Sequence, residues 1–194
     1  MDVKITNEQI EKLKSGVIIF APICLYSLLK NWQLSKLNIK KSGKEFNEGV
    51  NKIIGIPLQE WPKDIKEDYY KLSESLLNFE QLKDIFAELN YFLIFSTAGY
   101  ASKYINENDQ KIVLDNLFEI FNDRKMWEEK YPDNNAFNKY RQSENTAIEL
   151  QKNISKIIRE NDPLILIDLV MDIISMPMFF INPVIEKLFN DGKL

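Results

Sequence analysis

The sequence contains no histidine and a single cysteine, Cys24. Without histidine, catalysis by a histidine base and every zinc or iron site that needs an imidazole ligand are excluded. One cysteine can form neither an internal disulfide nor a thiolate cluster. Cys24 lies in the apolar run VIIFAPICLYSLL, so we expect a core residue rather than a nucleophile. These features favour a cytoplasmic protein that uses neither a metal nor a cofactor.

Glycine, proline and arginine are also scarce. Six glycines and seven prolines are too few for a disordered chain or a turn-rich all-β fold. Only three arginines are present, and the net charge is -4, which argues against nucleic-acid binding as the main task. The stretch Lys30–Lys44 has five lysines and no acid. We interpret it as a solvated loop, with weak contact to an anion as the alternative.

What the sequence does contain is apolar residues at helical spacing over almost its whole length. Thr6 and Gln9 form a capping-box pattern, and Asp162 followed by Pro163 marks a second helix start. Pro22 predicts a break or kink, and Pro177 and Pro183 predict the end of the C-terminal helix and the start of a short last one. The pattern predicts an all-α fold, a compact bundle or array of about seven to eight helices in one domain, 1–194. Its C-terminal helix is expected to be buried and mostly apolar.

Residues 164–185 form the most apolar stretch of the chain. A membrane-spanning helix needs about 20 apolar residues. Here Pro177 follows after 13 residues, and two aspartates interrupt the run. We therefore expect no transmembrane segment and place this helix at the centre of the bundle. The residues predicted to be most buried are Leu166, Ile167, Val170, Ile173 and Ile174.

Three polar side chains share one stripe of that helix: Asp168, Asp172 and Ser175. The stripe fits a solvent-facing edge of the helix. Alternatively, it lines a polar cleft in which the paired carboxylates hold a cation or a basic group of a partner.

Two further groups of residues are candidate contacts for a partner or ligand. Asp115, Glu119 and Asp123 are spaced four apart, which fits a solvated helix face or an acidic contact surface. The small residues of STAGYAS, 96–102, allow close approach of a second helix, or leave room for a ligand between helices. In the second case Tyr91, Tyr100 and Tyr104 would supply polar groups.

The charge is distributed unevenly along the chain. Residues 1–66 carry a net charge of +4 and residues 67–194 a net charge of -8. With no catalytic motif, this favours a non-enzyme that binds another protein, such as a bacterial immunity or antitoxin-type protein that neutralises a basic partner. Opposite poles are also compatible with a homodimer, and the asymmetry equally fits a drift in surface charge without a function. The alternative is a small-ligand- or metal-binding protein with its site between the 91–104 and 164–176 helices.

Overall fold

The computed structural model describes residues 4–36, 63, 79–121 and 134–190, and the regular elements in these residues are all helical. The all-α class predicted from the sequence is confirmed. The part of Lys30–Lys44 beyond Lys36, and Asp123, lie outside the described residues. The elements are α1 (Asn7–Lys36), α4 (Phe79–Ala101), α5 (Glu107–Phe118), the 3-10 helix η2 (Glu119–Phe121), α6 (Asn134–Gln142), α7 (Thr146–Ile158), α8 (Pro163–Met176), the π-helical turn η4 (Pro177–Ile181) and α9 (Asn182–Asn190).

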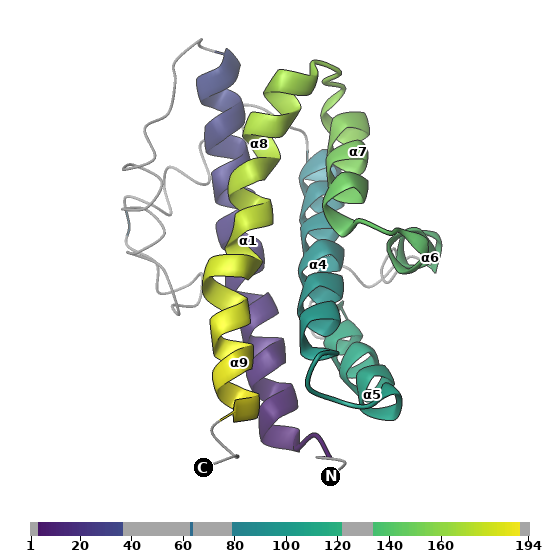
Figure 1. Cartoon of the computed structure of the whole chain (residues 1–194). Coiled ribbons are helices and arrows are strands. Elements are labelled where there is room, and N and C mark those ends of the chain that lie inside the picture. The colour runs from purple at the N-terminus through teal and green to yellow at the C-terminus, as the bar shows by residue number, and fades with distance from the viewer. Residues whose placement is uncertain (1–3, 37–62, 64–78, 122–133, 191–194) are drawn as a thin grey trace.

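The described helices form a bundle around α1 and α4 (Figure 1). The rod formed by α8, η4 and α9 runs antiparallel to α1 along one side of the bundle, and α7 packs along α4. Helices α5 and α6 lie on the far side of α4 from this rod. Fully enclosed side chains come from α1 and α4 and from the helices packed against them, including Leu169 and Ile173 of α8, so the core lies between these helices.

The start of α1 has the predicted capping box. The Thr6 amide donates to Gln9 Oε1 at 2.9 Å, and the Gln9 amide donates back to Thr6 Oγ1 at 3.2 Å. The break predicted at Pro22 is wrong, because α1 continues through it to Lys36. A proline inside a helix costs about 3 kcal/mol. Packing outweighs that cost here, since the neighbours Ala21 and Ile23 are both buried.

Helix α8 starts as predicted, with Asp162 Oδ1 accepting from the Leu164 amide at 2.9 Å and Pro163 in the first turn. The α-helix α8 ends at Met176, as Pro177 predicts, but the chain keeps its direction there. The chain passes through a π turn, in which the Asn182 amide donates to the Pro177 carbonyl, and continues as α9. Because α8, η4 and α9 form one rod, the described residues hold six separate helices, slightly fewer than expected.

This continuity also removes the length argument against a membrane span. By length and composition alone, two helices of the described residues could cross a membrane, Asn7–Trp32 and Pro163–Asn190. The most apolar window of the first is 56% buried within the protein and that of the second 39%. Core helices of soluble proteins have the same length and composition.

Helix α8 packs against the bundle with one face only. Its buried residues are Leu166, Leu169, Val170, Ile173 and Met176. The prediction that Ile167 is buried is wrong, because this side chain points away from the core and is 44% exposed. Ile174 is half-buried. The expectation that neighbouring helices surround α8 fails because α1 and α7 contact it on its inner side, which leaves the outer side open.

Candidate functional site

Most of the large exposed apolar side chains among the described residues lie on the α8–η4–α9 rod. We call this surface the apolar face; it consists of Leu164, Ile167, Met171, Met178, Phe179 and Val184, which are 44 to 73% exposed. Large exposed apolar side chains that gather on one element of a folded protein commonly mark an interaction site. The sequence had pointed to the polar stripe of the same helix and not to these residues.

The spacing along the apolar face is that of a coiled-coil seam. Leu164, Met171 and Met178 follow one another at intervals of seven, and Ile167 stands three residues after the first of them. Such a seam is complementary to a second helix laid along it. The rod has 28 residues, so at the rise of an α-helix the available docking length is about 42 Å.

The predicted polar stripe lies beside the apolar face. Asp168 is exposed, whereas Asp172 is half-buried and its Oδ2 accepts from Asn31 Nδ2 at 2.9 Å. Asn31 Nδ2 also donates to the Asp168 carbonyl, at 3.5 Å. Ser175 Oγ donates to the Asp172 carbonyl at 2.8 Å, which ties it to its own helix. The structure therefore brings Asp172 to α1 and leaves Asp168 on the rim of the apolar face.

The acidic residues of α5 and η2 lie elsewhere in the bundle. Asp115 is exposed. Glu119 Oε2 accepts from Lys14 Nζ at 3.1 Å, which ties η2 to α1. Asp123 lies outside the described residues. A carboxylate tied to a lysine of the same protein is a weaker candidate for a partner's basic group than Asp168.

Two of the candidate tyrosines lie where α4 meets α9. The Tyr100 hydroxyl donates to the Glu186 carboxylate, and this hydrogen bond raises the pKa of Tyr100 well above its usual value. The Lys103 ammonium lies 4.1 Å from the centroid of the Tyr100 ring. Tyr104 stacks on Phe189 with ring centroids 5.6 Å apart. Tyr100 thus connects α4 to α9, and Tyr104 connects the turn after α4 to α9. Tyr100 in addition lines a groove.

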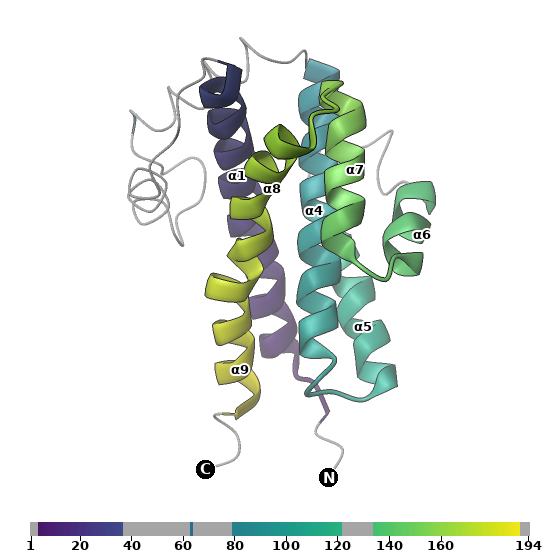
Figure 2. The same cartoon turned by 45° about the horizontal axis from the view of Figure 1, so that its top comes forward.

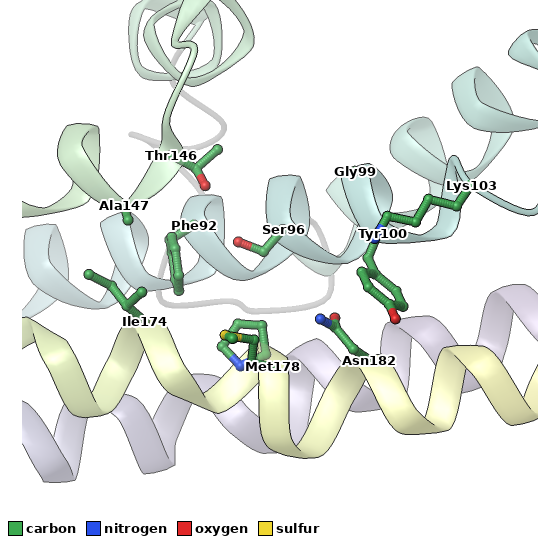
Figure 3. A pocket seen from close by; sticks show the side chains of 11 residues that line it. Phe92, Ser96, Gly99, Tyr100, Lys103, Thr146, Ala147, Ile174, Met178 and Asn182 are labelled. Atoms are coloured by element: carbon green, nitrogen blue, oxygen red, sulfur yellow. The ribbon is translucent and has the colours of Figure 1, made fainter.

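That groove lies between α4, the start of α7 and the η4 turn, and its volume is about 300 Å³ (Figure 3). It is close to the location predicted for a ligand between the 91–104 and 164–176 helices. Of the predicted residues, Tyr100 lines it, whereas Asp168, Asp172, Ser175 and Tyr104 do not. The lining residues are Phe92, Ser96, Gly99, Tyr100, Lys103, Thr146, Ala147, Ile174, Pro177, Met178 and Asn182.

Within the described part of the chain, no group of three or more acidic or cysteine side chains is placed to hold a metal ion. Cys24 is buried, and burial raises the pKa of its thiol, which opposes formation of a nucleophilic thiolate.

Sequence reasoning missed a polar cluster centred on Glu88. Its Oε2 accepts from the Tyr140 hydroxyl at 2.8 Å and from Asn153 Nδ2 at 2.9 Å, so one carboxylate joins α4, α6 and α7. Burial raises the pKa of Glu88 above its usual value, and the two hydrogen bonds oppose that shift in part. No local pattern could have revealed the cluster, because its members are 52 and 65 residues apart along the chain.

No family model matches the chain, and no curated protein or solved structure matches it.

Proposed function

We propose that the protein is a non-catalytic protein-binding protein whose partner lays a helix along the apolar face. One observation carries the proposal: Leu164, Met171 and Met178 are more than half exposed and repeat at the spacing of a helix-packing seam. Leaving such a surface in water is unfavourable by about 25 cal/mol per Å² of apolar area. A partner helix that covers it would recover this free energy.

The charges on the rod favour a basic partner. Between Pro163 and Asn190 the rod carries Asp168, Asp172 and Glu186 but only one base, Lys187. A partner helix with lysine or arginine beside its apolar stripe would complement the exposed Asp168. The same charges oppose docking on an anionic membrane, because faces that bind such membranes are flanked by lysine and arginine.

The proposed cellular role is neutralisation of a basic partner in the cytoplasm, as bacterial immunity and antitoxin proteins do. The support for this role is the net charge of -4, the buried Cys24, which fits a reducing compartment, and the absence of histidine. A helix-in-groove contact of this kind would neutralise the partner by covering its surface.

A matched pair of substitutions tests the proposal. Ile167 on the apolar face is 44% exposed, and Ile112 on α5 is 42% exposed. Ile167→Glu should abolish capture of a specific protein from extracts of the source cells, and Ile112→Glu should leave it unchanged. Both variants should melt like the wild type, since neither side chain is buried.

The purified pair should then bind with an affinity that falls as salt rises, because the basic flank is attracted to an exposed acid. Asp168→Lys should weaken binding by about tenfold, the equivalent of 1.4 kcal/mol. Equal capture by Ile167→Glu and wild type would refute the proposal. So would self-association through the apolar face in light scattering, or co-flotation of the protein with lipid vesicles.

A further inference from the structure

The groove beside η4 exists because α7 covers only part of α4. Helix α7 begins at Thr146, and it shields the first half of α4 while leaving the second half uncovered (Figures 1 and 2). Past Thr146 and Ala147, the space between α4 and the rod is open to solvent. Its volume of about 300 Å³ lies at the lower end of the range for small-molecule pockets.

The groove has two ends of different chemistry, as Figure 3 shows. Phe92 and Ile174 form one end, and Met178 lies towards the middle. Tyr100 and Lys103 form the other end. Lys103 is the one charged residue that lines the groove, and the described residues give its ammonium a tyrosine ring but no ion-pair partner. Glu186 is nearby, but it accepts from the Tyr100 hydroxyl and does not line the groove.

Gly99 forms part of the wall between these two ends. A Cβ atom added there would meet nothing within 4 Å, so close packing does not require glycine. Glycine inside a helix costs about 0.5 to 1 kcal/mol relative to alanine. No contact within the protein offsets this cost. Because Gly99 has no side chain, the groove stays open at this position. Opposite lies η4, and π turns often occur at functional sites.

We propose that this groove binds a small amphiphile with one aliphatic chain and an anionic head, of the class of medium-chain carboxylates. The chain lies against Phe92, Ile174 and Met178, and the carboxylate reaches the Lys103 ammonium. Charge complementarity selects the anionic head, because the lining residues carry one positive charge and no negative charge. The inference is independent of the proposed partner, since only Met178 belongs to both surfaces.

Calorimetric titration with decanoate, below the concentration at which it forms micelles, tests the proposal. The wild type should bind one decanoate per chain and should bind 1-decanol at least about tenfold more weakly, since a charge-assisted contact is lost. Lys103→Gln should remove that preference for the carboxylate. Lys111→Gln, a change of an exposed lysine on α5, should leave it intact.

Gly99→Leu should block the groove and reduce decanoate binding by more than about tenfold. Its control is Gly16→Leu on α1, where an added Cβ also meets nothing within 4 Å and which does not line this groove. Thermal melts establish that both variants fold. Absence of saturable binding to the wild type would overturn the proposal, as would equal affinity for decanoate and decanol. Binding that survives Gly99→Leu in a folded variant would place the ligand elsewhere and overturn it too.

Discussion

Glu88 connects three helices through a single carboxylate oxygen, with Tyr140 and Asn153 as its donors. The folded protein disfavours the ionised form of Glu88, because burial raises the pKa of this carboxyl above the usual 4.5. Lys139 favours the charged form and Glu149 disfavours it. A group whose pKa is raised by folding stabilises the protein most when protonated. Its contribution is therefore present below pH 4.5 and is lost as the pH rises through the folded pKa.

This leads to a prediction for Glu88→Gln, which removes the titration. The free energy of unfolding of the wild type minus that of the variant should decrease as the pH rises from about 4 to 7. Urea denaturation of both proteins at several pH values measures the difference. A difference that is constant or increases with pH would contradict the raised pKa.

Two isoleucines of α8 provide a comparison at the scale of the element. Ile173 is fully buried and Ile167 is 44% exposed. Ile173→Ala should lower the free energy of unfolding by about 2 to 5 kcal/mol, because it empties a packed site. Ile167→Ala should cost less than about 1 kcal/mol. Chemical denaturation of the two variants checks both values. Equal losses of stability in the two variants would mean that α8 does not bury Ile173 and expose Ile167 as described.

Helix α4 contains Gly99, where an added Cβ meets no atom within 4 Å. Gly99→Ala should therefore stabilise the protein by about 0.5 to 1 kcal/mol, since alanine is the better helix former and no clash opposes it. The midpoint of thermal unfolding should rise. A fall would show that glycine is required there for packing.

Local signals in the sequence predicted two helix starts correctly and the course of the chain at Pro22 wrongly. Thr6 with Gln9, and Asp162 with Pro163, cap helices through hydrogen bonds within one turn, so a few residues are sufficient to predict them. Pro22 does not break α1, because its neighbours are buried against helices that lie far away in the sequence. A local pattern does not contain that information.

The same limit applies to the candidate site. Periodicity shows that α8 is apolar almost all round, but it does not show which side has no covering helix. Ile167 was therefore predicted to be buried, and the apolar face was missed. The location of a groove between the 91–104 helix and the C-terminal helix was predictable from the small residues near Gly99. Its polarity was not, because that depends on where Lys103 lies relative to Phe92 and Ile174.

At the scale of the whole molecule, the bundle is joined at the end where α1 begins and α9 ends (Figure 1). The Ile5 amide donates to Asp109 Oδ2 at 3.1 Å, which ties the start of α1 to α5. Gln9 Nε2 donates to the Leu188 carbonyl at 3.0 Å, which ties α1 to α9. Helices from three parts of the chain thus depend on one another there.

Asp109→Ala should therefore weaken the whole fold. Asp109 is only 3% exposed, and its Oδ2 also accepts from Asn106 Nδ2 at 3.3 Å. Removal of the carboxylate leaves the Ile5 amide without this acceptor and should cost about 1 to 3 kcal/mol. Urea denaturation measures the loss, and hydrogen exchange should show faster exchange of the Ile5 amide. An unchanged exchange rate would mean that this bond does not form in solution.

The π turn at Pro177–Ile181 gives the rod one residue more than a continuous α-helix would have over the same length. That extra residue sets the phase of α9, so that Ile185 and Phe189 reach the core. In genetic terms, this turn can absorb the loss of one codon. An in-frame deletion of one residue here would leave a continuous α-helix over the same length, so Ile185 and Phe189 would still reach the core. In a helix without such a turn, the loss of one residue would rotate everything after it by about 100°.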